Sequence, residues 1–417
     1  MINIHKVRFK KITCFTYSSF VFFIFFSSIH ILPEFLSWML NKAIYLTLIL
    51  FLIALLSNKR TKNFKKNDFI LFLVFTGYFF LSSFVFFHNF STNEAIAKVI
   101  GNGFGFVVLF IMFLTATKVL SVKELIRPFY FSCLLITFCA LIIYLGWEPT
   151  FYSAEQNEKI SEISKASKFS LLFFSGPYAN KNGFAQFLVV SLTVLSLNLL
   201  VNLEAKYFEK LVCRFLIVTC LIFLLATVSR GGILAVAIIF GLYALKQLSL
   251  KKSILALAVT VPILLLIYFS IHDIIYFIFE RFDSEGIGSR QRIWKDAIDT
   301  VLENPFSGVG TYTYNNNGRH LSAHNSYLQM VASNGIFVFT FWFIIHLTAI
   351  YSAFKVMIKH AKSKVDQFSL LSSSSVLAII TTQFFESQLI DPFGTTTVFF
   401  MIMFMLNRYK ILHSNNR

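Results

Sequence analysis

Three arginines and a histidine in one polar stretch are the residues of this sequence best suited to chemistry. Arg281, Arg290 and Arg292 surround the start of a helix-like run, and His324 and Asn325 follow it after a Gly-Val-Gly turn. A guanidinium group binds phosphate through paired hydrogen bonds, and an imidazole can accept a proton at neutral pH. The stretch is too long for a simple connector, and long loops often carry function. Because apolar segments flank it, we predict a site for a phosphate-bearing lipid donor.

Each of these residues also has a plain structural interpretation. Asp283 and Glu285 can pair with the neighbouring arginines and leave only a solvated surface. Asn325 is of a type that often caps a helix N-terminus, here that of a short helix expected to end at Gly335, and His324 can be an ordinary interfacial histidine. In the catalytic interpretation His324 is a general base on an acceptor hydroxyl, with His320 as a rival.

Two further polar segments lie at the edges of apolar runs. Arg230, within Ser-Arg-Gly-Gly at 229–232, either binds a phosphate beside glycines that admit a headgroup, or snorkels from a tight turn. Asn180 and Asn182, within 176–183, either contact sugar hydroxyls or belong to a turn that leads into a helix.

Acidic candidates stand near the end of the chain. Glu386 and Asp391 flank the turn expected between the last two apolar segments. Either carboxylate can orient a catalytic residue, pair with an arginine, or face water, and both are kept as candidates for a supporting acid.

An amphipathic helix is expected to position Arg290. Its apolar residues recur in pairs one turn apart, which is typical of one helix face: Ile293, Trp294, Ala297, Ile298, Val301 and Leu302. Arg290 lies one turn before Trp294 and so projects from the same face, while Asn304-Pro305 ends the helix. We expect this face to rest on the membrane or on other helices, with Arg290 and Trp294 at headgroup level.

Composition indicates a helical membrane protein. The 417 residues are 56% hydrophobic and 14% charged, with a mean hydropathy of +0.70. Apolar runs of about 20 residues, the length that crosses a bilayer as a helix, recur throughout. We predict about 12 transmembrane helices in one membrane domain, 1–417, near 14–32, 38–57, 69–87, 99–117, 128–146, 184–202, 213–228, 232–247, 253–271, 335–353, 369–389 and 394–407.

The charge distribution predicts the orientation. The net charge is +17, and most of the Lys and Arg fall in alternate loops that contain few acids. This is the asymmetry of cytoplasmic loops, so both termini are expected in the cytoplasm, with membrane lipids rather than nucleic acid as partners. The segment 272–335 becomes a large periplasmic loop between transmembrane helices 9 and 10, and 147–183 a smaller periplasmic segment.

Cofactor chemistry finds no support in the sequence. The 5 cysteines fall in or beside apolar runs without a C-x-x-C pair, and no phosphate-loop, dinucleotide, zinc-protease or serine-hydrolase motif is present. We therefore expect no metal and no cofactor. A donor activated by its own diphosphate leaving group fits arginines alone.

These motifs together resemble the O-antigen ligase and O-antigen polymerase superfamily of bacterial membrane glycosyltransferases. The matching features are S-R-G-G at 229–232, R-x-x-x-W at 290–294, N-P-F-x-G-V-G at 304–310, H-N-S-Y-L at 324–328 and N-K-N-G-F-A at 180–185. The specific resemblance covers roughly 175–350.

The resemblance implies a donor, an acceptor and a cellular location for the reaction. Such proteins transfer a glycan from undecaprenyl diphosphate to a sugar hydroxyl at the periplasmic face of the inner membrane, in lipopolysaccharide or surface-polysaccharide biosynthesis. Arg230, Arg290 and Arg292 would bind the diphosphate, and His324 would act on the acceptor hydroxyl. A ligase uses lipid A–core as acceptor, whereas a polymerase uses the growing polysaccharide. A secondary transporter or lipid-glycan flippase is the rival class, disfavoured because few charges fall within the apolar runs.

Overall fold

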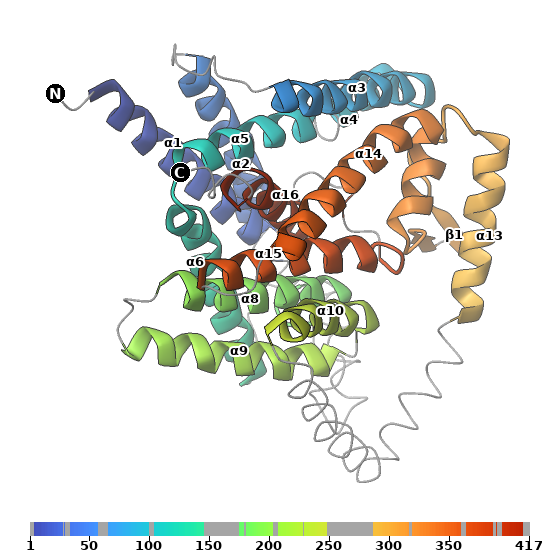
Figure 1. The fold of residues 1–417 in the computed structure, drawn as a ribbon. Coiled ribbons are helices and arrows are strands. Elements are labelled where there is room, and N and C mark those ends of the chain that lie inside the picture. The colour runs from blue at the N-terminus through green and yellow to red at the C-terminus, as the bar shows by residue number, and fades with distance from the viewer. Residues whose placement is uncertain are drawn as a thin grey trace, which may run out of the picture.

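The chain folds into a bundle of helices with one small hairpin at its edge (Figure 1). The computed structural model describes residues 4–27, 29, 34–56, 66–99, 104–145, 175–178, 181–202, 207–227, 229–247, 287–316, 319–359, 364–386, 389 and 394–411. The helices are α1 (Ile4–Ser27), α2 (Glu34–Leu56), α3 (Lys66–Asn89), α4 (Thr92–Lys98), α5 (Gly105–Val119), α6 (Val122–Tyr144), α8 (Lys181–Val201), α9 (Tyr207–Thr227), α10 (Arg230–Gln247), α13 (Ile287–Glu303), α14 (Ser326–Lys359), α15 (Lys364–Thr382), α16 (Thr395–Met405) and η2 (Leu406–Ile411). Strands β1 (Tyr314–Asn316) and β2 (Arg319–Leu321) pair antiparallel. The predicted helical class is confirmed, with the hairpin as a small addition.

Several helices can cross a membrane. By length and composition, 6 are long and apolar enough: Phe9–Ser27, Asp68–Asn89, Val122–Tyr144, Lys181–Val201, Tyr207–Thr227 and Ser326–Ile358. Shorter apolar helices lie at Trp38–Ile53, Gly105–Val119, Arg230–Ala244 and Gln367–Thr382. The span predicted near 253–271 lies outside the described residues, and each other predicted span overlaps a described helix. A membrane protein is thus confirmed, while the count of twelve spans stays a prediction.

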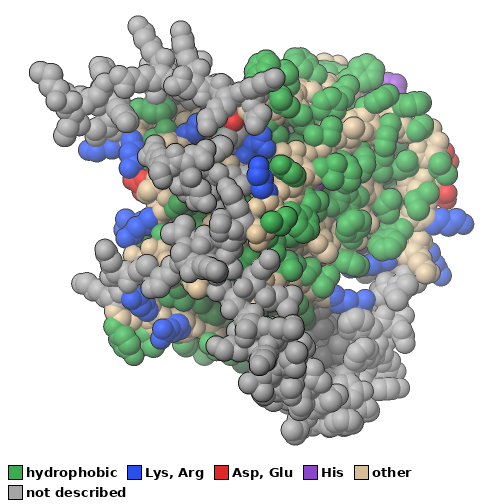
Figure 2. All heavy atoms as spheres, in the orientation of Figure 1, with side chains coloured by type: hydrophobic (Ala, Val, Ile, Leu, Met, Phe, Trp, Pro, Cys, Tyr) green, Lys and Arg blue, Asp and Glu red, His purple; other side chains and the backbone are tan. Residues whose placement is uncertain are grey.

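Aromatic rings fill the centre of the bundle. Phe129 packs edge-on against Phe25 at 5.5 Å between ring centroids and against Phe399 at 5.9 Å, which joins α6 to α1 and α16. Such pairs prefer edge-to-face geometry because the ring edge is positive and the ring face negative. Hydrophobic side chains also cover much of the outer surface over α3 and α14 in Figure 2, with Lys and Arg toward its margins. This pattern is typical of a lipid-facing bundle.

Helix α14 is broken at Gly335, where the sequence predicts that a short helix ends. Gly335 has φ of 73° and ψ of 172°, and a Cβ there would collide with the carbonyl oxygen of Phe306. Only glycine adopts this conformation at low cost. The segment before Gly335 packs on α13, and the segment after it continues as a long apolar helix.

Helix α13 stands at the edge of the bundle beside α14, on the right of Figure 1. It ends at Glu303, immediately before Asn304-Pro305, as predicted. Its predicted apolar face is divided, since Ile293 and Ala297 are buried whereas Ile298 and Leu302 are exposed. The buried half rests on the polypeptide that leads into α14.

Candidate active site

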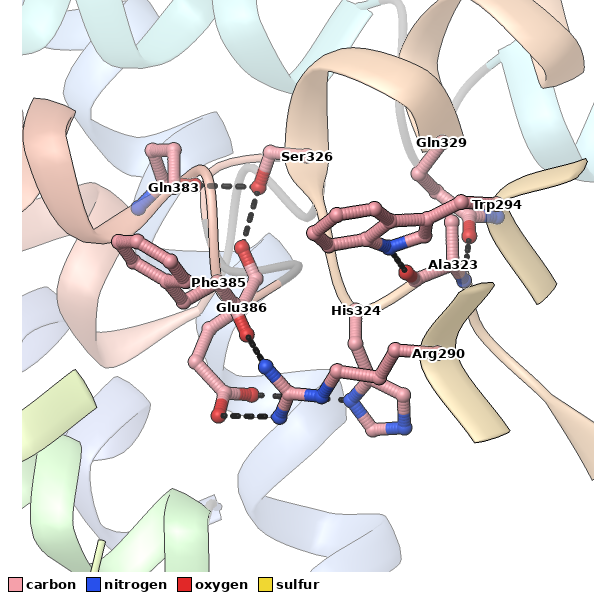
Figure 3. A network of polar contacts seen from close by, with 9 residues as sticks. All are labelled: Arg290, Trp294, Ala323, His324, Ser326, Gln329, Gln383, Phe385 and Glu386. Atoms are coloured by element: carbon pink, nitrogen blue, oxygen red, sulfur yellow. Dashed lines mark hydrogen bonds and ion pairs between the residues drawn. The ribbon is translucent and has the colours of Figure 1, made fainter. Parts of the chain in front are cut away.

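Arg290 reaches from α13 to the turn that follows α15. The buried residues Ile293 and Ala297 fix α13 against the following segment, and Arg290 lies one turn before Ile293. Its Nη1 donates to the carbonyl oxygen of Phe385 at 3.2 Å, and its Nη2 lies 3.7 Å from Oε1 of Glu386 (Figure 3). The guanidinium therefore bridges two elements distant in sequence.

The Gly-Val-Gly turn docks on the break in α14. The amide of Val309 donates to Ala332 O at 3.0 Å, that of Gly310 to Ser333 O at 2.7 Å, and that of Ile336 to Pro305 O at 2.8 Å. Gly308 and Gly310 have positive φ, and a Cβ on Gly308 would collide with the α14 backbone. These glycines have a structural role, which is to seat the segment that leads to His324.

His324 lies in a strained connection held on both sides. Its φ is +48°, an uncommon value for a residue other than glycine. The neighbouring Ala323 uses both backbone groups, since its amide donates to Gln329 Oε1 at 2.7 Å and its carbonyl accepts from Trp294 Nε1 at 2.9 Å. After it, Asn325 Oδ1 accepts from the amide of Leu328 at 3.1 Å and caps α14. Both flanks fix the direction of the imidazole.

Glu386 lies at the centre of the site. Its Oε2 is 3.8 Å from Nδ1 of His324, and its Oε1 is the partner of Arg290 (Figure 3). The side chain is largely buried, whereas the Arg290 and His324 side chains are 28% and 32% exposed and can meet a ligand. The carboxylate therefore faces both the guanidinium and the imidazole.

The start of α10, which carries Arg230, lies beside the same carboxylate. A Cβ on the adjacent Gly231 would lie 3.2 Å from Cγ of Glu386, so the start of α10 touches the acid directly. Partial desolvation lowers the pKa of the exposed Arg230 from its ordinary value, and the charge of Arg290 lowers it further. The two guanidinium groups repel each other, and an anion bound between them would offset this repulsion.

The arrangement suits a doubly charged anion. Arg230 and Arg290 present cations near the N-terminal end of α10, where the helix dipole adds positive potential. Glu386 is the carboxylate that contacts Arg290 and lies against Gly231, the neighbour of Arg230. In that part of the chain no group of three or more His, Cys, Asp or Glu is placed to bind a metal ion.

The other predicted site residues have diverse positions. Arg292 is exposed on α13 and forms no hydrogen bond or ion pair with a described residue. Asn182 lies partly exposed in the first turn of α8, whose Ala185 packs on Gly232 of α10. Asn180 and Asp391 lie outside the described residues. Their predicted roles remain predictions.

Trp294 and Asn325 have structural partners in the site. The Trp294 indole binds the Ala323 carbonyl, and the Asn325 side chain caps α14, as one of its two interpretations predicts. Contacts of either residue with a glycan stay predictions. Both residues support His324 from opposite sides.

Sequence reasoning missed the polar residues that connect these parts. Ser326, Gln329 and Gln383 are buried, and each is hydrogen-bonded to backbone or side chain near the site. Gln329 also donates to Tyr312 O at 2.7 Å. The available signal was a glutamine within an otherwise apolar helix, since buried amides are kept only where they find partners.

A known protein family matches part of the chain that includes several of these residues. The O-antigen ligase family profile matches residues 215–343, which include Arg230, Arg290 and His324. No curated protein matches the chain. The matched region ends before Glu386, which the structure nevertheless brings to His324 and Arg290. The family match supports membership of this chain in the O-antigen ligase superfamily.

Proposed function

We propose that this protein transfers a glycan from undecaprenyl diphosphate to a sugar hydroxyl of lipid A–core or of a growing polysaccharide. The observation that carries the proposal is the meeting of Arg290, His324 and Glu386, with Arg230 at the start of α10 close to Arg290. The family match supports the same class of reaction. Ligase and polymerase differ in the acceptor, and this site chemistry serves both.

The arginines act on the leaving group. The bond between the sugar anomeric carbon and the diphosphate oxygen breaks, and the electron pair leaves with undecaprenyl diphosphate. Fixed guanidinium groups of Arg230 and Arg290 stabilise the charge that develops on this oxygen. Arg292, on the same helix as Arg290, is a further contact for the outer phosphate.

His324 acts on the acceptor. The acceptor hydroxyl oxygen forms the new bond to the anomeric carbon, and its proton passes to the imidazole and then to water. The imidazole nitrogen Nδ1 faces Glu386, so Nε2 is the atom that receives this proton. Glu386 orients the ring and compensates the positive charge that forms on it.

The reaction is proposed at the periplasmic face of the bacterial inner membrane, with both termini in the cytoplasm. Loop charge asymmetry supports this orientation. In a cysteine-free background, Thr313→Cys should react with a membrane-impermeant thiol reagent from outside and Lys123→Cys should not. Labelling at position 123 alone would reverse the orientation.

The decisive experiment is transfer by purified protein from undecaprenyl-diphosphate-linked oligosaccharide to an acceptor glycan, with donor binding measured in parallel. His324→Ala should lose roughly 10²–10⁴-fold in turnover and still bind donor. His320→Ala should transfer normally. Wild-type protein that releases no undecaprenyl diphosphate would exclude the proposed function, whereas wild-type turnover by His324→Ala would exclude only the role of the base.

A further inference from the structure

The turn that carries Glu386 is attached to α14 by a buried polar pair. The Ser326 hydroxyl donates to Gln383 Oε1 and also contacts the Glu386 carbonyl oxygen at 2.9 Å (Figure 3). The Ser326 amide donates to Gln383 O at 2.8 Å. Ser326 and Gln383 are both completely buried. Ser326 is also two residues after His324, so the pair links the base to its acid.

Gln383 also organises the turn itself. Its Oε1 accepts a second hydrogen bond from the Leu389 amide at 3.0 Å, while its Nε2 donates to Ile379 O at 3.1 Å. The Leu389 carbonyl in turn accepts from Trp342 Nε1 at 3.2 Å. The turn is therefore fixed on both sides of the Gly335 break, by Ser326 before it and Trp342 after it.

Ser326 binds the Glu386 carbonyl directly from α14, while the Glu386 amide donates to Thr382 O at 3.1 Å within its own segment. The Glu386 and His324 side chains are 3.8 Å apart and Arg290 is 3.7 Å from the carboxylate, distances at which small displacements matter. A shift of about 1 Å in a reacting group can lower a rate by about 10²-fold. Buried hydrogen bonds in a low-dielectric interior are well suited to prevent such a shift.

We infer that Ser326 and Gln383 are positioning residues that place the Glu386 carboxylate against His324 and Arg290; the inference rests on the proposed function. Neither side chain needs to touch donor or acceptor. Their effect is on turnover, because the cations that bind the diphosphate remain in place when the pair is lost.

Single substitutions give the first test. Ser326→Ala removes the hydroxyl, and Gln383→Met removes the acceptor at similar length. Each should lower transfer about 10- to 100-fold with donor binding unchanged. Ser326→Thr keeps the hydroxyl and should recover most of the rate. Ser373→Ala is the matched control, since Ser373 is buried on α15 and its Oγ has no hydrogen-bond partner among the described residues.

A double-mutant cycle separates positioning from a general loss of structure. In a Glu386→Gln background, Ser326→Ala should cause little further loss, because the group that it positions is already absent. Full additivity of the two losses, or wild-type transfer by Ser326→Ala, would overturn the inference. Failure of wild-type protein to transfer would instead overturn the proposed function.

A crosslinking measurement is independent of activity. With the five native cysteines removed, His324→Cys and Glu386→Cys should be joined efficiently by a short bis-methanethiosulfonate reagent. Adding Ser326→Ala should lower the yield several-fold, and adding Ser373→Ala should not change it. An equal yield in all three proteins would show that the turn is positioned without Ser326.

Discussion

The loop module (residues 287–316 and 319–335) and the helical bundle are stabilised by different interactions. In the bundle, hydroxyl groups return to their own helix, as when Thr193 donates to Val189 O at 2.9 Å and Thr219 to Phe215 O at 3.0 Å. In the loop module, side chains bind backbone of other segments, as when Tyr312 Oη contacts Ile293 O at 2.9 Å. The bundle is therefore defined by packing, and the loop module by a few directional bonds.

This difference explains where chemistry is located. Apolar packing tolerates many substitutions of similar volume, so it sets the overall shape more firmly than the direction of any one side chain. Directional bonds to backbone place a functional group closely, but each one is individually important. Arg290 and His324 belong to the loop module, whereas Arg230 and Glu386 belong to the bundle, and the candidate site lies where the two meet.

The largest expected effect is a difference in transfer rate between variants of Arg290 and Arg292, which both lie on α13. Arg290→Ala should lower transfer by about 10³-fold, because a fixed cation at the leaving group is lost. Arg292→Ala should lower it only a few-fold, because that side chain is exposed and unpaired with described residues. Arg290→Lys should recover part of the rate but not the planar pair of donors. Equal losses in the two alanine variants, measured by transfer in vitro, would mean that the contact with Glu386 does not identify the functional arginine.

The next effect tests the junction between the loop module and the bundle. Gly335→Ala should destabilise the protein by more than about 2 kcal/mol, because positive φ and a collision with the Phe306 carbonyl both oppose a Cβ. Gly241→Ala is the control in α10, where a Cβ meets nothing within 4 Å, and should be neutral or stabilising. Thermal unfolding in detergent measures both. An unchanged transition for Gly335→Ala would show that the break in α14 is dispensable.

The two regions also differ in how far the sequence predicts them. Hydrophobic runs depend only on local composition, so the helices of the bundle could be predicted, as could the end of α13 and the break at Gly335. Arg290, His324 and Asn325 could be selected because their motif spacing is local.

Contacts between distant segments could not be predicted in this way. Glu386 and Asp391 were equivalent candidates in the sequence, and only the packing of α14 on α15 brings Glu386 to His324. Ser326 and Gln383 are 57 residues apart, and neither shows a pattern that names its partner. The division of the apolar face of α13 was also missed, since a periodic pattern does not reveal that Ile293 and Ala297 are buried while Ile298 and Leu302 remain exposed.

A smaller expected effect is on the pH dependence of the stability of the loop module. Burial raises the pKa of Tyr312, and its hydrogen bond to Asp296 at 2.8 Å raises it further. The folded pKa is above the unfolded value of about 10, so this stabilisation is complete below pH 10 and is lost as pH rises through the folded pKa. Tyr312→Phe should lower the stability of the loop module by about 1–3 kcal/mol at neutral pH. The variant should also lose less stability than the wild type as the pH is raised. The rate of limited proteolysis between α13 and α14, followed against pH, measures this stability. If wild type and Tyr312→Phe lose stability in parallel at alkaline pH, the loss belongs to other groups.

The smallest effect compares one substitution in both regions. Trp294→Phe removes the hydrogen bond to Ala323 O beside His324, and Trp342→Phe removes the bond to Leu389 O within the bundle. Each loses about 1 kcal/mol of interaction. Trp294→Phe should lower turnover several-fold with little change in thermal unfolding, because the ring still packs and only the direction of the His324 connection is affected. Trp342→Phe should act mainly on unfolding, since aromatic neighbours retain the ring while the Leu389 carbonyl is left buried without its donor. Turnover should fall less, because Ser326 and Gln383 still hold the turn at Glu386 and Leu389. Transfer rates and unfolding temperatures of the two variants, measured on the same preparations, test this. If both variants lose stability equally and turnover equally, directional bonds in the loop module are no more closely tied to catalysis than packing in the bundle.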